Sequence, residues 1–283
     1  MNSYASPHKP GSAMTRVWRW LLKPKALRRR IAFQIQNEHF AELGIRIPIG
    51  DNLFATVEHA SQFLSFGEMF AQQEYAAMLD HMPLPRRWID LGAHAGYFTL
   101  WLAARISSSS DPSWEALLIE PDPRMTSVLK TNLAQPAMHD RARLRVGAIG
   151  KPTDTTSTSM PFHLRPGMVS SHDQSVGTGH STQVEVISAD ALTAELPGPL
   201  DLIKLDVEGA EYIFAEHYEP LYRNATAIVS EWHAPSVDHR CINDFRSKLR
   251  AAGFKRNIPL GPVNLSDTPG PLAATGLELF VRS

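Results

Sequence analysis

The sequence predicts an α/β protein built on a doubly wound, mostly parallel sheet of seven strands with helices on both faces. Three observations lead to this fold class. From about residue 86 onward, short apolar runs alternate with segments in which apolar residues have helical spacing. The runs are apolar at nearly every position, as is typical of strands buried on both faces. With 283 residues, 43% of them hydrophobic, the chain is long enough to bury such a core.

The expected elements alternate in the order that produces parallel strands joined by helices. The segment 66–82 reads as a helix that leads into the sheet. Beyond it, strands are expected at 87–92, 115–122, 142–150, 200–209, 225–233 and 276–283, and helices at 96–106, 123–134 and 241–254.

Two stretches depart from this alternation. Residues 1–45 form a basic N-terminal extension that we expect to be partly disordered or helical, and residues 46–283 form the main domain. Lys and Arg lie beside tryptophans in the extension, so a peripheral membrane contact is one interpretation and a solvated helix is the other. Residues 151–183 form a polar insertion, with short strands expected at 160–166 and 182–188.

Composition narrows the classes of function. The net charge is −1, so the chain lacks the overall electrostatic footprint of a nucleic-acid-binding protein. Cys241 is the single cysteine, which fits a reducing compartment, and we expect a cytoplasmic protein. No apolar run approaches the ~20 residues that span a bilayer.

A glycine turn follows the first core strand, in the stretch "WIDLGAHAGYFTLWLA" at residues 88–103. Ligands bind beyond the carboxyl ends of parallel strands, where glycine lets the backbone approach closely. Gly92 and Gly96 form a G-x-x-x-G pattern with His94 at its centre, which lacks the G-x-G-x-x-G pattern of dinucleotide sites. Asp90 ends the strand, where it suits a cationic or amino-bearing ligand.

The second core strand ends in an acid that suits a ribose. Glu120 closes "LLIE", and an acid at this place accepts hydrogen bonds from both ribose hydroxyls. Pro121 and Asp122 follow, and Asp122 is a plausible N-cap before Pro123. The turn and the acid together predict a nucleoside site. A nicotinamide oxidoreductase is an alternative, against which the incomplete glycine pattern weighs, and a nonenzymatic scaffold is another.

The fourth core strand carries the second group of polar residues, in "LDLIKLDVEGAEYIF" at residues 200–214. Lys204 and Asp206 are two positions apart and therefore face the same side of the sheet. Because an isolated buried ammonium is costly, Lys204 is expected to pair with a carboxylate there. Glu208 and Glu211 have a structural interpretation, since acids in the first turn of a helix complement its dipole.

These motifs resemble those of the FkbM family of class I S-adenosylmethionine-dependent methyltransferases, which have a Rossmann-like fold. "IKLDVEGAE" is similar to the family's signature, and "DLGAHAGYFTL", "IEPDP", "VGAIG", "VEVISADAL" and "LELFVRS" follow in the family's order over residues 66–283. The resemblance implies methyl transfer from S-adenosylmethionine to a hydroxyl of a sugar, glycan or secondary metabolite. It also implies a cofactor site at Asp90, Gly92, His94, Gly96, Glu120, Pro121, Asp122 and Ala148, with His94 at the cofactor's edge.

A hydroxyl is a poor nucleophile, so a base near the cofactor should take its proton. Asp206 is the preferred base, or the group that holds the acceptor, and Glu208 and Glu231 support it. His233 is the second candidate base, because histidine titrates near neutral pH. No metal is required by this interpretation. Mg²⁺ bound by Asp206 and Glu231, together with Glu208 and His233, is the less favoured alternative.

Overall fold

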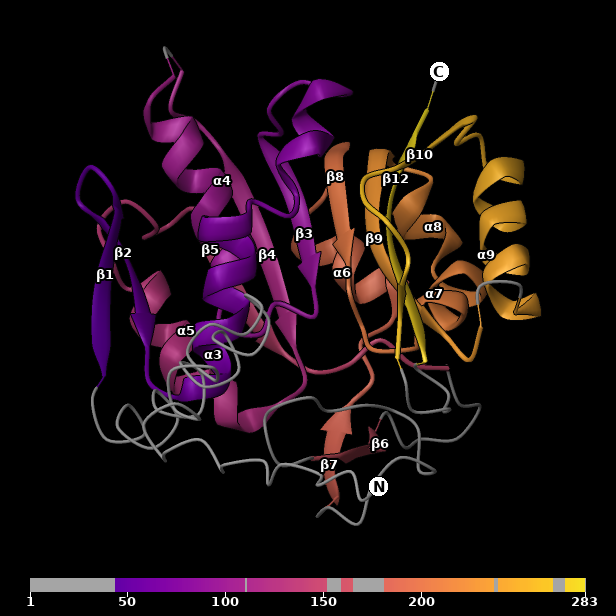
Figure 1. Ribbon diagram of the computed structural model, residues 1–283, viewed down its shortest axis with the longest axis horizontal. Coiled ribbons are helices and arrows are strands. Elements are labelled where there is room, and N and C mark those ends of the chain that lie inside the picture. Colours follow the sequence, from indigo (N-terminus) through magenta and orange to yellow (C-terminus); the bar gives the residue numbers. More distant parts are fainter. Residues whose placement is uncertain are drawn as a thin grey trace, which may run out of the picture.

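The computed structural model describes residues 44–109, 111–151, 159–164, 181–236, 239–266 and 273–282 (Figure 1). Nearly all of the basic extension expected at 1–45 lies outside these residues, as does most of the polar insertion. None of the described helices is long and apolar enough to cross a membrane.

The central sheet has the strand order β10-β12-β9-β8-β3-β4-β5. Five neighbouring strands, from β9 to β5, are parallel, while β12 pairs antiparallel with both β9 and β10. The mostly parallel sheet of seven strands is therefore confirmed, and the two-residue strand β11 pairs with β12 as an eighth. The strands are β3 (Arg87–Leu91), β4 (Glu115–Glu120), β5 (Ala142–Val146), β8 (Leu200–Leu205), β9 (Ala225–Ala234), β10 (Arg256–Pro259), β11 (Asn264–Leu265) and β12 (Ala274–Val281).

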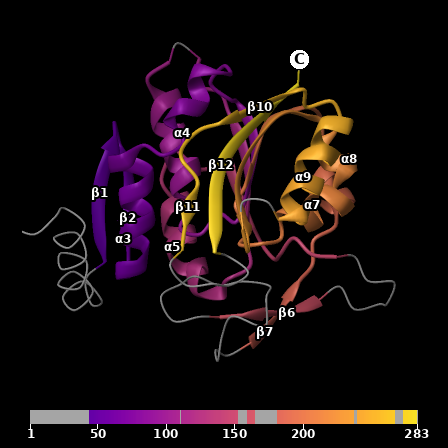
Figure 2. The same cartoon turned by 45° about the vertical axis from the view of Figure 1, so that its right-hand side comes forward.

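Helices cover both faces of this sheet, as Figures 1 and 2 show. On one face α4 and α5 pack on alternate strand residues such as Trp88, Leu118 and Leu202. On the other face the next residues along the strands, Ile89 and Ile203 among them, pack against α6, α7, α8 and α9. The helices are α4 (Tyr97–Ser107), α5 (Thr126–Leu133), α6 (Ala189–Glu195), α7 (Glu211–His217), α8 (Glu219–Tyr222) and α9 (Arg240–Ala251).

The segment before the sheet differs from the single helix expected at 66–82. A hairpin of β1 (Ile45–Gly50) and β2 (Leu53–Val57) leads into α3 (Ala60–Phe66), the π-helical turn η1 (Gly67–Gln72) and the 3₁₀ turn η2 (Ala76–Asp80). Gln73 has φ 53°, a left-handed conformation that ends η1. The prediction of a single helix is therefore wrong. The segment is helical on both sides of Gln73 but is interrupted at this residue.

Two further elements complete the described chain. The strands β6 (Ser159–His163) and β7 (Ser181–Glu185) pair antiparallel, close to the short strands expected in the insertion. The helix expected at 123–134 begins as the 3₁₀ turn η3 (Pro123–Met125) and continues as α5. Asp122 caps η3 by accepting a hydrogen bond from the Arg124 N–H at 2.9 Å, as its position before Pro123 predicts.

Candidate active site

The candidate site lies at the carboxyl ends of β3, β4, β8 and β9. Side chains alternate between the two faces of a strand, so every second residue shares a face. On the α4 face, apolar residues deep in the sheet give way to polar ones near its carboxyl edge. The polar residues that continue these rows are Asp90 after Trp88, Glu120 after Leu118, Lys204 and Asp206 after Leu202, and Glu231 after Val229.

Three alternate residues of the glycine turn between β3 and α4 lie in the left-handed region. Gly92 has φ 75°, His94 φ 50° and Gly96 φ 78°. A Cβ on Gly92 would lie 1.8 Å from the Asp206 carbonyl oxygen, so only glycine lets β3 and β8 approach this closely. The spacing of the two glycines thus reflects turn geometry, as the sequence predicts.

Glu120 fixes this turn to the end of β4. Its carboxylate accepts hydrogen bonds from the backbone N–H groups of His94 at 2.6 Å and Asp122 at 2.8 Å. Burial raises the pKa of Glu120 to about 7, although both N–H groups act in the opposite direction. Pro121 follows directly, and the Asp122 carboxylate also pairs with the Arg124 guanidinium, Oδ2 to Nη2, at 2.6 Å.

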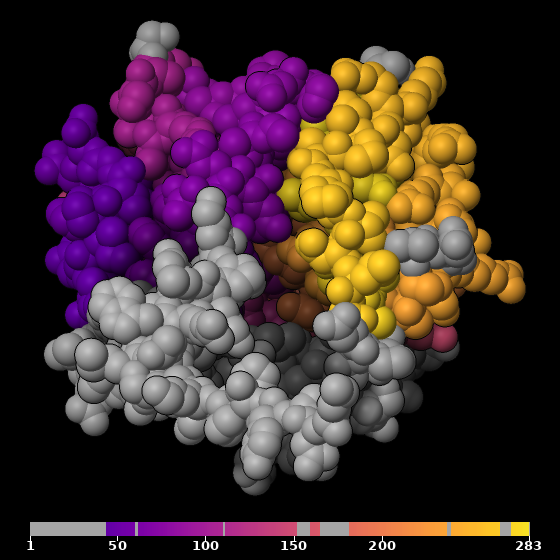
Figure 3. Space-filling view, in the orientation of Figure 1, coloured from indigo at the N-terminus to yellow at the C-terminus, as the bar shows by residue number. Residues whose placement is uncertain are grey.

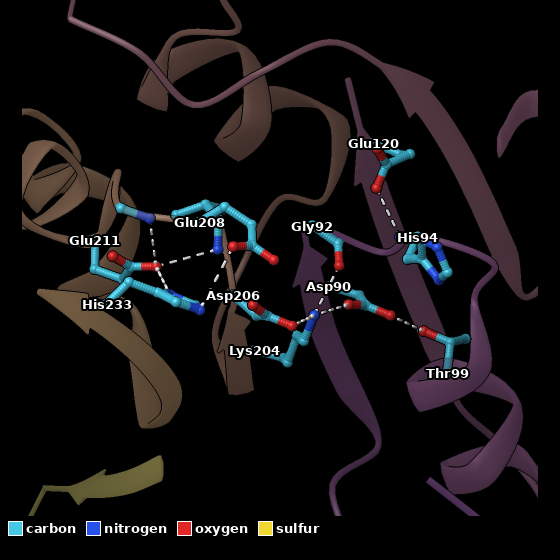
Figure 4. A network of polar contacts seen from close by, with 12 residues as sticks. Asp90, Gly92, His94, Thr99, Glu120, Lys204, Asp206, Glu208, Glu211 and His233 are labelled. Atoms are coloured by element: carbon cyan, nitrogen blue, oxygen red, sulfur yellow. Dashed lines mark hydrogen bonds and ion pairs between the residues drawn. The ribbon is translucent and has the colours of Figure 1, made fainter. Parts of the chain in front are cut away.

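Lys204 is buried in the middle of a small polar network (Figure 4). Its Nζ lies 3.1 Å from Asp206 Oδ2 and 3.6 Å from Asp90 Oδ1, and it donates to the Gly92 carbonyl oxygen at 2.7 Å. This confirms the expected pairing of the strand lysine with a carboxylate. Asp90 is fully buried and also accepts a hydrogen bond from Thr99 Oγ1 at 2.9 Å. Asp90 therefore contacts the turn through Lys204 in this conformation.

The turn that follows β8 is organised by Glu211. This fully buried carboxylate accepts weak hydrogen bonds from the N–H groups of Val207 and Gly209, both at 3.3 Å, and its Oε1 lies 3.1 Å from His233 Nδ1. Glu208 Oε2 lies 3.6 Å from the other ring nitrogen. The dipole interpretation of Glu211 is thus incomplete, because the side chain links α7 to β9.

Three carboxylates surround the His233 ring. Burial by itself lowers the pKa of this imidazole, but the carboxylates of Glu211, Glu208 and Glu231 outweigh it and raise the pKa well above the ordinary value. The imidazolium form is therefore favoured at neutral pH, and such a ring is a poor general base.

A pocket opens beside the glycine turn, and it gathers acids from separate parts of the chain. Gly92, His94, Lys204, Asp206 and Glu231 line it. Glu68 and Glu74, from the broken helical segment, line it as well and were not predicted. Burial and the neighbouring carboxylates Glu68 and Asp206 raise the pKa of Glu74 to about 7. No local motif marks these two acids, and only the fold brings them to the pocket.

Two of the expected cofactor residues have mainly structural contacts. Gly96 is buried and ends the turn where α4 begins. Ala148 is buried too, and its backbone exchanges hydrogen bonds with Glu185 O at 2.8 Å and Ile187 N at 3.0 Å. Ala148 therefore ties the segment after β5 to the segment after β7.

Comparison with known proteins identifies the family. The family model of the methyltransferase FkbM domain matches residues 90–255, more than half of the chain. The chain belongs to the FkbM methyltransferase family. This FkbM protein is an S-adenosylmethionine-dependent methyltransferase, as its motifs predict. The family match excludes the alternative of a nicotinamide oxidoreductase. No curated protein matches it in sequence.

Solved structures of other proteins are similar to this FkbM protein at low identity. One is a precorrin-6y C5,15-methyltransferase from Geobacter metallireducens, with 12% identity, a TM-score of 0.43, and coverage of 75% of this chain and 89% of that one. Another is the fibrillarin pre-rRNA processing protein of Methanococcus jannaschii, with 15% identity, a TM-score of 0.44, and coverage of 86% and 85%. Likenesses this distant do not bear on the substrate.

Proposed function

We propose that this FkbM protein transfers a methyl group from S-adenosylmethionine to a hydroxyl oxygen of a sugar, glycan or secondary metabolite. One observation carries the proposal: the carboxylates of Asp206 and Glu231 line the same pocket as the glycine turn. A hydroxyl must lose its proton as its oxygen is methylated, and a carboxylate beside the methyl donor is suited to accept that proton.

The residues present fit the cofactor. Gly92 lets the turn lie directly against the end of β8, and Glu120 stands at the strand end where a ribose is held. His94 Nδ1 is buried without a hydrogen-bond partner among the described residues, and the residue lines the pocket. Burial lowers the pKa of His94 to about 4, so the ring is neutral at the cofactor's edge. Gly92, His94 and Glu120 would hold the cofactor directly, and the other predicted residues would shape the turn.

Asp206 and Glu231 take different parts in this proposal. Asp206 is oriented by its ion pair with Lys204, which leaves its second oxygen to hold the acceptor hydroxyl. Glu231 has no hydrogen bond or ion pair within the described part of the chain, and burial together with the charge of Asp206 raises its pKa well above the ordinary value. Glu231 lines the pocket without such a partner, so it is the proposed proton acceptor. When bound, S-adenosylmethionine supplies a methyl group on a sulfonium, and that group leaves behind a neutral thioether.

The test separates cofactor binding from chemistry. Calorimetric titration should show binding of S-adenosylhomocysteine and none of NAD. Asp206→Asn and Glu231→Gln should leave that affinity within about threefold and lower the rate of methyl transfer by about 10²–10⁴-fold, the usual contribution of acid–base catalysis. Asp190→Asn, an exposed acid on α6, is the matched control. Full activity of both variants would refute the assigned roles.

Mg²⁺ is the second candidate participant, and a specific cluster motivates it. Ligand atoms of Asp206, Glu208 and His233 lie within 4.8 Å of one another. Glu231, the partner expected from the sequence, does not belong to this cluster among the described residues. The His233 ring is already held by Glu211 and Glu208, and Mg²⁺ prefers oxygen ligands, so the metal-free reaction is favoured. Loss of activity on dialysis against EDTA, restored by Mg²⁺, would reverse this preference.

A further inference from the structure

A second cavity adjoins the pocket beside the glycine turn. Its walls come from residues 72–77, from the loop and strand at 260–264, from residues 275–277 of β12, and from Glu231 on β9. Its volume is about 320 Å³, at the lower end of the range for small-molecule sites, about 300–1,000 Å³. Figure 3 shows the surface hollowed between the purple N-terminal part and the yellow C-terminal strands.

The two cavities share Glu74 and Glu231. Both residues line each cavity. In contrast, Asp206, Gly92 and His94 line only the pocket beside the glycine turn and not the second cavity. A molecule in the second cavity would therefore contact the two carboxylates from one side while the methyl donor lies on the other. This is the relation that methyl transfer requires between acceptor and donor, which must approach each other in line.

The chemistry of the walls restricts the ligand. None of the residues that line the second cavity in the described part of the chain is Lys, Arg or His. The polar groups are the two carboxylates, the side-chain amides of Gln72, Gln73 and Asn264, and the Thr275 hydroxyl. Carboxylates accept hydrogen bonds from O–H and N–H groups, and they repel phosphate and carboxylate groups.

We propose that the second cavity is the acceptor site and that it takes a compound with hydroxyl or protonated amine donors and without phosphate or other anionic groups. This inference rests on the proposed function and narrows its substrate class. Glu74 and Glu231 would accept hydrogen bonds from the acceptor, and the hydroxyl to be methylated would lie at their junction with the cofactor pocket. The two carboxylates repel phosphate groups, which disfavours nucleic acid and nucleotide acceptors.

The first test fills the second cavity with a larger side chain and leaves the pocket beside the glycine turn unchanged. A Cβ on Gly261 would meet nothing within 4 Å, and the residue lines the second cavity alone, so Gly261→Trp places a ring in the acceptor site. Gly44 is also exposed and open, and Gly44→Trp is the matched control. Ala77→Leu, on the opposite wall, is a second filling variant.

The second test identifies the ligand class with three related probes. Methyl α-glucoside is neutral, glucosamine carries a protonated amine, and glucose 6-phosphate is anionic. Saturation-transfer NMR on the complex with S-adenosylhomocysteine should show the neutral or the amine probe binding at least tenfold more tightly than the phosphate. Gly261→Trp and Ala77→Leu should abolish that binding, and Gly44→Trp should not.

The outcomes separate this inference from the proposed function. Preferential binding of glucose 6-phosphate, binding of none of the probes, or probe binding that survives both filling variants would each overturn the acceptor site. In all these cases S-adenosylhomocysteine would still bind to the wild type and the variants alike, which also shows that the variants are folded. Failure of S-adenosylhomocysteine to bind the wild type would instead refute the proposed function itself.

Discussion

Replacement of Lys204 by methionine tests whether this lysine holds the two sides of the site together. Its ammonium is nearly fully buried and lies among Asp90, Asp206 and the Gly92 carbonyl oxygen. Lys204→Met keeps the apolar stem and removes the charge, so the carboxylate of Asp90 is left buried with Thr99 as its remaining side-chain partner. Removal of one member of a buried ion pair costs about 3–5 kcal/mol.

The size of the effect sets the assay. A domain of about this length loses about 2–4 °C in melting temperature per kcal/mol, so calorimetry should show a drop of roughly 6–20 °C. Urea unfolding should give the same loss of free energy. Lys248→Met, an exposed lysine on α9, is the control and should change the unfolding free energy by less than about 0.5 kcal/mol.

A double variant identifies the cause of the loss. Lys204→Met leaves the Asp90 carboxylate buried without its cationic partner, and Asp90→Asn removes that charge. The double variant should therefore recover about 2 kcal/mol of unfolding free energy relative to Lys204→Met alone. Asp206 is half-buried and remains solvated, so it needs no such compensation. A loss below about 1 kcal/mol for Lys204→Met, or no recovery in the double variant, would refute the account of Lys204 as the charge that balances Asp90.

Three further predictions concern the cofactor side. Gly92→Ala adds about 1–2 kcal/mol of left-handed strain and a clash with the Asp206 carbonyl, so titration should show at least tenfold weaker binding of S-adenosylhomocysteine, whereas Gly44→Ala should bind normally. Burial raises the pKa of Glu120 from 4.5 to about 7, so between these two pH values the folded state binds this proton more tightly than the unfolded state does. The unfolding free energy should therefore decrease as pH rises from about 4.5 to about 7. Ribose hydroxyls favour the ionised carboxylate, so affinity for S-adenosylhomocysteine should fall below pH 7, and Glu120→Gln should remove this dependence. Glu231→Gln should weaken binding of the cationic S-adenosylmethionine roughly 3–10-fold more than that of the neutral S-adenosylhomocysteine, and equal losses would exclude an electrostatic role for Glu231.

The sequence predicted the parts of this site that depend on local patterns. Apolar runs followed by acids placed Asp90, Glu120 and Asp206 at strand ends, and the period of two put Lys204 on the same face as Asp206. The glycine spacing predicted a tight turn, which the positive φ values of Gly92 and Gly96 explain. These residues are set by a few positions along one strand, so a single sequence suffices to locate them.

The acids that come from elsewhere could not be predicted. Glu74 reaches the pocket because the helical segment breaks at Gln73. This residue has a left-handed backbone conformation, but it is not a glycine, so the sequence does not mark the break. Glu211 appeared to serve only the dipole of α7, and its contact with His233 depends on how α7 packs beside β9. Both facts follow from tertiary packing, which periodicity in one segment does not encode.

The position of Lys204 predicts that substitutions near this residue affect the proposed methyl-donor and acceptor sites together, whereas substitutions farther out affect the acceptor site alone. One ammonium contacts the Gly92 carbonyl oxygen of the proposed cofactor turn and the carboxylate of Asp206, the proposed acceptor-binding residue. A substitution that moves either group therefore displaces the other. The outer wall of the second cavity lies at 72–77 and 260–264. Within the described chain, the hydrogen bond and ion pairs of Lys204 go to Gly92, Asp90 and Asp206 instead. Changes in this outer wall alter what the acceptor touches while the turn and its lysine keep their geometry. Acceptor specificity is therefore expected to be set mainly by these outer segments, and methyl-donor binding by the ends of β3, β4 and β8.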